Sequence, residues 1–463
     1  MPRAGRNLLI ECADEYNERV VFNLSPHLLA FARWVPTPRA AVPLLAAPLL
    51  LAALSACGDD RPPPPPTDMM ITFDAGDGGM IVDVDAQAKD LGGMGVDGGG
   101  GGGPCHVEGA VLTLATDTTD RTVRLVDVAV SASTFVVAWT DARSAVGDAY
   151  VYAWPAADAT GLEHRVTDDF ALTREPHLGA RTDGFTVGWV DNTTGTFELF
   201  ARPLDAAGIP SGAAQRLTNN ALREDSPRVA GLGGTATMFA WLESDGSGGP
   251  TVTHALPLDA TGAAVGAPTL ATAAPRHPSE LTLSRLGTGA ALAWNEDGTV
   301  YLQRLTSAGV MAGAAAAINT EANASGSAAL ALDATGGGVA FGVRVAGARA
   351  EIRMRTVGPT GATVGAETIL TAPPATGADP MIAAYASGYA VAYRATAADG
   401  TSAIRVAFAT ATGEYSSSLD VAATTATGGA PHLAVAPDGR ILVAWMDANA
   451  PSADVRAAKV ICE

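Results

Sequence analysis

Basic residues are scarce in this chain, and lysine is almost absent. The 463 residues include 48 Asp and Glu against 29 Lys and Arg, a formal net charge of −19, and Lys89 and Lys459 are the only lysines. A surface with this excess of acid repels nucleic-acid phosphates and anionic lipid headgroups. The composition therefore argues against a nucleic-acid partner.

Catalytic signature motifs and long hydrophobic runs are missing too. The sequence has no Gly-x-Ser-x-Gly, no His-Glu-x-x-His, no phosphate-binding glycine loop and no metal-spaced cluster of Cys and His. The longest apolar run, residues 40–56, contains Pro43 and Pro48. It is short and interrupted for a membrane span but suits the core of a secretion signal. The motifs thus assign no catalytic residue, metal or cofactor, and we expect export.

The sequence does contain an internal repeat of about 50 residues. Seven aromatic residues follow one another at intervals of 47 to 53 residues, and each ends a short apolar run such as FVVAW or ILVAW. These residues are Trp139, Trp189, Trp241, Trp294, Phe341, Tyr393 and Trp445. We interpret them as packing between modules, because they alternate with small apolar residues on one strand face.

Each repeat has the pattern of four short strands. In residues 176–218, β-rich segments are separated by Asp183-Gly184, by the polar turn after Asp191 and by Asp205-Ala-Ala-Gly208. Glycine supplies the positive φ of tight turns, and the short spacing leaves no room for crossover helices. Four antiparallel strands repeated seven times predict an all-β, seven-bladed β-propeller.

The seventh repeat is one strand short. It begins at Pro431 and the chain ends after its third strand, whereas residues 109–116 match the outer strands of other repeats, such as 265–272. An N-terminal outer strand would therefore close the ring. In this register a disulfide between Cys105 and Cys462 would replace the missing turn; the alternative is two unrelated buried thiols.

A low-complexity stretch precedes the repeats. After Cys57 come five consecutive prolines and an Asp/Gly-rich segment that ends in six glycines. Such a composition buries too little apolar surface to fold. We therefore divide the chain into a leader with a signal peptide over residues 1–56, a disordered tether over residues 57–104, and the propeller over residues 105–463.

The last residues of the apolar run, Leu54-Ser55-Ala56-Cys57, resemble the lipobox of bacterial lipoproteins. The resemblance implies cleavage before Cys57 and acylation of its thiol, with palmitate or a similar chain. The protein would then be lipid-anchored in the bacterial cell envelope, at the outer membrane, facing the periplasm or the surface. Such leaders are normally shorter, so we expect the true start near Val35. An ordinary secretion signal is the alternative.

The repeat itself resembles propeller units common in secreted bacterial proteins. In these units an apolar-Trp-x-Asp-x-Arg run is followed by a polar turn and a Tyr-rich strand, and residues 136–153 (VVAWTDARSAVGDAYVYA) are the fullest copy. Arg143 has no counterpart after Trp189 or Trp294, and the repeats of Phe341 and Tyr393 lack the acid. The resemblance implies a fold and no particular function.

An acidic residue stands two positions after the aromatic in five repeats: Asp141, Asp191, Glu243, Glu296 and Asp447. If each aromatic closes the second strand, these carboxylates line one face of the ring. They are candidates for a ligand rim that binds a cation or a polar ligand. The alternative is that each carboxylate accepts hydrogen bonds from the next backbone amides and fixes the turn.

Charged residues and histidines also gather beside prolines where innermost strands begin, near the expected central channel. They are His177, Arg223, Glu224, Arg276, His277, Asp379 and His432. Three histidines could hold a metal. Spread over three repeats without a short-spaced pair, they fit ordinary rim residues better.

Two functions from different classes remain. The first is a non-catalytic binding or scaffold lipoprotein of the cell envelope, a monomer with a protein or polysaccharide ligand. The second is a propeller-fold hydrolase that acts on glycans through paired carboxylates at the channel mouth. The Ser-x-Asp-x-Gly-x-x-Trp turn typical of sialidase-like propellers is missing. The fold decides neither function, because one architecture serves many activities.

Overall fold

The computed structural model describes residues 9–13, 19–23, 72–74, 81–83 and 105–463, the last range with gaps at 118–125, 142, 144–146, 169–170, 246–250, 274–277, 346–349, 372–373, 387, 425–427 and 450–451. The chain divides into two compact units, Met1–Asp97 and Gly98–Glu463. No helix in the described parts is long and apolar enough to cross a membrane.

The first unit contains four short strands that pair in the order β2-β1-β4-β3. They are β1 (Leu9–Ala13), β2 (Arg19–Asn23), β3 (Thr72–Asp74) and β4 (Ile81–Asp83). Strands β3 and β4 fall within the predicted tether, where we expected no strand. Cys57 and the apolar run before it lie outside the described residues.

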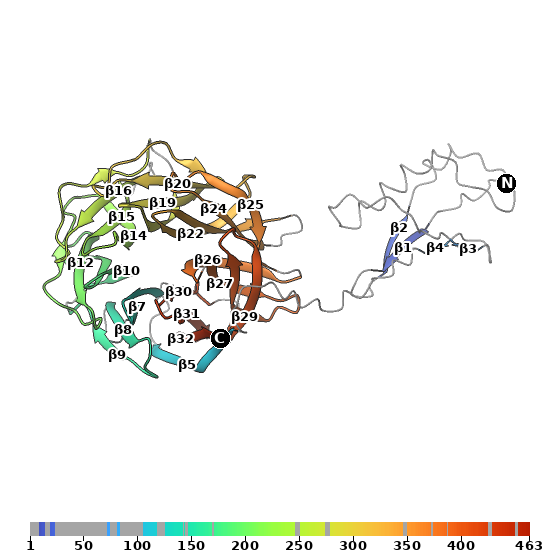
Figure 1. Ribbon diagram of the computed structural model, residues 1–463, viewed down its shortest axis with the longest axis horizontal. Coiled ribbons are helices and arrows are strands. Elements are labelled where there is room, and N and C mark those ends of the chain that lie inside the picture. The colour runs from blue at the N-terminus through green and yellow to red at the C-terminus, as the bar shows by residue number, and fades with distance from the viewer. Residues whose placement is uncertain are drawn as a thin grey trace. The chain divides into compact units, whose positions relative to one another are not determined.

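The second unit is a ring of seven four-stranded antiparallel sheets, or blades (Figure 1). We number the blades 1 to 7 in the order of their innermost strands along the chain. The innermost strands are β6 (Val126–Ser131), β10 (Thr173–Arg181), β14 (Arg223–Gly231), β18 (Ser279–Leu286), β22 (Ala324–Asp333), β26 (Thr376–Tyr385) and β30 (His432–Val435). The second strands are β7 (Thr134–Asp141), β11 (Gly184–Asp191), β15 (Thr237–Ser244), β19 (Gly289–Glu296), β23 (Gly336–Arg344), β27 (Gly388–Thr396) and β31 (Ile441–Asn449).

The outer half of each blade completes this pattern. The third strands are β8 (Asp148–Pro155), β12 (Glu198–Asp205), β16 (Val252–Leu258), β20 (Thr299–Leu305), β24 (Ala350–Val357), β28 (Ser402–Thr410) and β32 (Ser452–Cys462). The outermost strands are β9 (Leu162–Arg165), β13 (Gln215–Arg216), β17 (Thr269–Leu270), β21 (Ala316–Ala317), β25 (Thr363–Ile369), β29 (Tyr415–Thr424) and, in blade 7, β5 (Cys105–Asp117). The predicted seven-bladed β-propeller is confirmed.

The hydrophobic core lies between the blades. In the described residues one cluster of buried side chains occupies each of the seven interfaces; Trp139 and Phe135 of blade 1, for example, share a cluster with Leu442 of blade 7. All seven repeat aromatics are at most 2% exposed, which confirms their packing role. They do not close the second strand, however, because the strand continues for at least two residues beyond each of them.

The turns between the third and outermost strands have one repeated geometry. In five blades a glycine has φ between 76° and 88°, and its N–H donates to the carbonyl oxygen three residues earlier. These glycines are Gly208, Gly262, Gly309, Gly361 and Gly413. A side chain is strained at such a φ, so the repeated glycine is required by the turn, as the sequence predicted.

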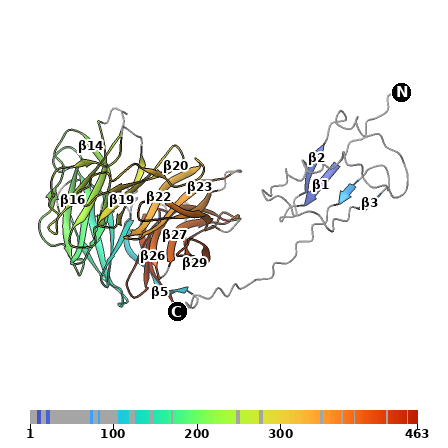
Figure 2. The same cartoon turned by 45° about the horizontal axis from the view of Figure 1, so that its top comes forward.

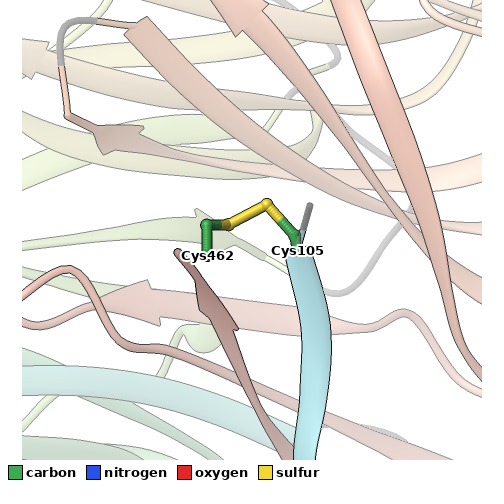
Figure 3. Close-up of a disulfide and its surroundings, with 2 residues drawn as sticks. All are labelled: Cys105 and Cys462. Atoms are coloured by element: carbon green, nitrogen blue, oxygen red, sulfur yellow. A yellow bond between two sulfur atoms is a disulfide. The ribbon is translucent and has the colours of Figure 1, made fainter. Parts of the chain in front are cut away.

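The ring is closed by its two ends. Strand β5 pairs antiparallel with β32, with Cys105 directly opposite Cys462, and the C-terminus lies beside β5 (Figure 2). The two cysteines form a disulfide (Figure 3). The predicted closing strand and disulfide are both confirmed.

A lysine on blade 7 forms hydrogen bonds with the backbone of blade 1. The Lys459 ammonium donates to the carbonyl oxygens of Pro155 (3.1 Å), Ala156 (2.9 Å) and Asp158 (2.6 Å) and lies 4.3 Å from the centre of the Trp154 ring. Burial lowers the pKa of Lys459, but three carbonyl oxygens and an aromatic face compensate for the lost water.

Removing the disulfide should loosen the ring. The bridge joins residues 357 positions apart, and constraining so long a loop of the unfolded chain is worth up to about 5 kcal/mol. We expect Cys105→Ser and Cys462→Ser to lower the melting temperature equally and the double variant to lower it no further. Two free thiols in the exported wild-type protein, found by mass spectrometry, would contradict this prediction.

Candidate functional site

The antiparallel blades give the ring two different faces. The loop face carries the loops between second and third strands together with the connections between blades. The turn face carries the turns between first and second strands and between third and outermost strands. The five predicted rim acids lie at or near the ends of second strands, so they share the loop face, as expected.

Two of these acids have the geometry of turn caps. Asp141 accepts a hydrogen bond from the backbone N–H of Arg143 (2.8 Å) and another from its Nε (2.6 Å). Asp191 accepts from the backbone N–H of Thr193 (2.6 Å) and from the hydroxyl of Thr173 (2.9 Å). Both carboxylates are buried, and both hold the loop that follows their strand.

Other rim acids are engaged by side chains. Glu243 contacts His254 Nε2 and Asn220 Nδ2, each at 3.1 Å. Asp447 forms an ion pair with Arg456 (3.3 Å) and accepts from the Thr424 hydroxyl (3.3 Å). Glu296 is half-buried at the end of β19. Among the described contacts, only those of Asp141 and Asp191 thus include the backbone hydrogen bonds of the turn-fixing alternative, and the ligand rim stays a prediction.

Three of the rim acids face a second acid that the sequence analysis missed. The pairs across the second and third strands are Asp141 and Asp148, Asp191 and Glu198, and Asp447 and Asp454. Like charges directly opposite each other destabilise a sheet. An arginine offsets each second acid: Arg165 on Asp148 (2.6 Å), Arg216 on Glu198 (2.9 Å) and Arg456 on Asp454 (3.4 Å).

The Trp-x-Asp-x-Arg motif is part of a stack of planar groups. Trp139 stacks on Tyr150 at 6.2 Å between ring centroids, and the Arg143 guanidinium lies 4.4 Å from the centre of the Tyr150 ring. Every repeat aromatic has a planar group opposite it on the third strand. These groups are Tyr150, Phe200, His254, Tyr301, Arg353, Arg405 and Arg456. In blade 1 the motif thus contributes packing contacts to the fold.

A hydrogen-bonded chain of polar side chains crosses four innermost strands at the centre of the ring. Asp127 on β6 receives hydrogen bonds from His177 Nδ1 (3.1 Å) and His432 Nδ1 (2.9 Å), and Arg228 Nη1 donates to His177 Nε2 (2.8 Å). The backbone N–H groups of Val128 and Leu178 also donate to Asp127. The chain links blades 7, 1, 2 and 3 across the point of closure.

The protonation states of these hydrogen-bonded side chains follow from their geometry. Burial disfavours the charged form of Asp127 and would raise its pKa. Hydrogen bonds from the two imidazoles outweigh this effect and hold the pKa of Asp127 well below its usual range. Burial and the neighbouring Arg228 charge lower the pKa of His177 from 6.5 to about 4. His177 is therefore neutral at pH 7, with its proton on Nδ1 and its Nε2 accepting from Arg228.

The residues predicted near the channel are placed there where they are described. His177, Arg223, Glu224, Asp379 and His432 all lie on innermost strands, whereas Arg276 and His277 fall outside the described residues. Burial and the charge of Glu198 raise the pKa of Glu224 to about 7. No group of three His, Cys, Asp or Glu that could hold a metal occurs in the described part of the chain.

Asp127 and Arg228 were missed by the sequence analysis. The signal was present, because both occupy the repeat position of His177, each pairing with the small residue that precedes the repeat aromatic of its blade. Aligning the innermost strands position by position would have found them.

Two hollows open on the turn face, at equivalent places in the repeat. The smaller, about 360 Å³, lies between blades 2 and 3 and is lined by Arg181, Asp183, Asp205 and Gln215 among others. The larger, about 700 Å³, lies between blades 5 and 6. Its polar side chains are Asp333, Thr335, Thr356, Tyr389 and Thr412, and the rest of its lining is apolar or glycine.

No protein-family model matches this sequence, and no curated protein matches it. Among solved structures, the Trypanosoma rangeli sialidase in complex with the inhibitor DANA has 8% identity and a TM-score of 0.43, over 77% of this chain and 60% of that chain, so this chain spans less than two thirds of its length. The BP39L lectin from Burkholderia pseudomallei has 15% identity and a TM-score of 0.43, over 70% and 95%. The β-propeller domain of the trilobed protease from Pyrococcus furiosus has 8% and 0.42, over 73% and 94%. These resemblances carry no argument about a site.

Acid should destabilise the propeller through His177. Because its folded pKa of about 4 lies below the ordinary 6.5, the unfolded chain binds one more proton between these values. The stabilisation is complete above about pH 6.5 and is lost as the pH falls toward 4, by about 1.4 kcal/mol per pH unit. Glu224, whose pKa is raised to about 7, gives a slope of the opposite sign over part of this range and is present in every variant. We therefore expect the slope of His177→Gln to differ from the wild-type slope by the contribution of His177, and His164→Gln on β9 to keep the wild-type slope. An unchanged slope in His177→Gln would refute the assignment.

Proposed function

We propose that this protein is a non-catalytic binding lipoprotein of the bacterial cell envelope. Its Cys57 would carry the lipid that anchors it in the outer membrane, facing the periplasm or the surface, and its propeller would act as a monomer on a protein or polysaccharide ligand. The lipobox-like residues before Cys57 and the apolar run support the anchor.

The observation that carries the binding role is the hollow between blades 5 and 6. Its volume of about 700 Å³ falls in the range of about 300 to 1,000 Å³ typical of ligand sites. It combines an apolar lining with a few polar side chains, which is the usual composition of a binding pocket.

A glycan hydrolase is supported less well. Most glycoside hydrolases use two carboxyl groups that flank the bond to be cleaved, and the hollow is lined by a single carboxylate, Asp333. On the loop face, Asp141, Asp191, Glu243 and Asp447 are bonded to neighbouring residues of the ring. These contacts hold the acids within the blades.

The anchor can be tested by fractionation. We expect the wild-type protein to partition with membranes and detergent, and Cys57→Ala to be released in soluble form or to stay unprocessed, because one thiol carries the acyl chains. Ser55→Thr, which leaves the acylated thiol in place, is the control. Unchanged membrane association of Cys57→Ala would refute the lipid anchor.

Binding without turnover is tested on the exported Cys57→Ala protein. We expect it to be retained by immobilised envelope polysaccharide or protein, with no new reducing ends or cleavage products in the flow-through after long incubation. Product release that a single carboxylate substitution abolishes would overturn the proposal in favour of the hydrolase. Failure to bind any polysaccharide or protein in the panel would overturn it as well.

A further inference from the structure

We propose that the hollow between blades 5 and 6 is a binding site for a neutral saccharide. This inference rests on the proposed binding function and names its site and ligand class.

The size of the two hollows differs with one residue at equivalent positions. Asp333 pairs with the first residue of the second strand in blade 5, and Arg181 occupies the same register position in blade 2. Arg181 reaches across to the next blade and donates to the carbonyl oxygen of Ala260 (2.6 Å), while also bonding Asp183 (2.9 Å). The shorter Asp333 makes no such crossing, and the space is about twice as large.

The residues that line the hollow favour an uncharged ligand. No Lys, Arg or His is among the residues that line the larger hollow, so a phosphate, sulfate or carboxylate would find no cationic partner there. A metal cation would find one carboxylate only, fewer oxygen ligands of that kind than such ions usually take. Hydroxyl groups and exposed backbone remain, and these match an uncharged ligand rich in hydroxyls.

Asp333 is held as an oriented hydrogen-bond acceptor. Its Oδ1 accepts from the backbone N–H of Thr335 (2.6 Å) and from the Thr335 hydroxyl (2.7 Å), and these bonds lower the pKa of Asp333. Oδ1 is therefore fixed by its own turn, and the side chain is exposed to the hollow. A carboxylate placed in this way can accept hydrogen bonds from sugar hydroxyls.

Tyr389 lines the same hollow as this carboxylate and contributes an aromatic ring. Its ring lies against Gly338 of blade 5, where a β-carbon would approach the ring to 3.1 Å. Burial, and then the charge of Asp333, raise the pKa of Tyr389, so its hydroxyl keeps its proton and can donate. An aromatic face with a polar edge suits a ligand that has both C–H and O–H surfaces.

The test uses the exported Cys57→Ala protein and a panel of glucose, galactose, mannose, fucose and N-acetylglucosamine, free and as disaccharides, with glucuronic acid and a tetralysine peptide as charged probes. Binding is followed by saturation-transfer NMR and titration calorimetry. The variants are Asp333→Asn and Tyr389→Leu, with Tyr389→Phe as the milder change. Gln215→Ala, in the hollow between blades 2 and 3, is the matched control.

We expect at least one neutral sugar to bind, a loss of tenfold or more in affinity for Asp333→Asn and Tyr389→Leu, a smaller loss for Tyr389→Phe, and no change for Gln215→Ala. Unfolding curves must show that each variant is folded. Neutral-sugar binding that ignores all three hollow variants would overturn this site while leaving the binding function intact. Binding of only the charged probes, or of no sugar by a protein that still captures envelope protein, would overturn the saccharide class alone.

Discussion

The pairing of β5 with β32 is the interaction on which the rest of the structure depends. Each blade buries its repeat aromatic against the preceding blade, so the cluster of Trp139 with blade 7 forms only when the ring is closed. Three specific contacts hold this closure: the Cys105–Cys462 disulfide, the hydrogen bonds from the Lys459 ammonium to three carbonyl oxygens, and the hydrogen bond from His432 to Asp127. A ring built from nearly equal units needs specific contacts where its ends meet, because packing alone would not distinguish that interface from the other six.

Close packing explains why polar side chains gather in the channel and on the loop face. The residue before each repeat aromatic is Ala or Gly in every blade, and a β-carbon on Gly188 would lie 2.2 Å from the Phe239 ring. At this position the interface therefore has no space for a larger side chain. The charged side chains of the central channel are buried, and each needs a partner because burial without one costs several kcal/mol. The chain from Arg228 to His432 meets that requirement with five hydrogen bonds to one carboxylate and one imidazole.

The fold could be predicted from the sequence because its signals are local or strictly periodic: the aromatic residues, the turn glycines and the two cysteines at the ends of the ring. The candidate sites could not be predicted, because the residues that form them are far apart in the sequence and are brought together only by the pairing of strands and the packing of blades. Asp127, His177 and Arg228 lie about 50 residues apart along the chain and touch only across blades. The planar group opposite each aromatic follows it by 7 residues in the case of Trp294 and Tyr301, but by 13 for Trp241 and His254. Loops of unequal length conceal such a pairing from any fixed spacing.

Departures from the repeat indicate where the ring can carry a binding site. A position that serves packing or closure is held to the same residue type in blade after blade, and a binding site requires something different in one place. Blades 5 and 6 are the two that replace Trp with Phe341 and Tyr393 and lack the acid two residues later. In blade 5 the second strand also opens with three glycines, Gly336 to Gly338. The larger hollow lies between these same two blades. This coincidence of irregular repeats and open space supports the proposed site on the turn face between blades 5 and 6, rather than one at the regular acids of the loop face.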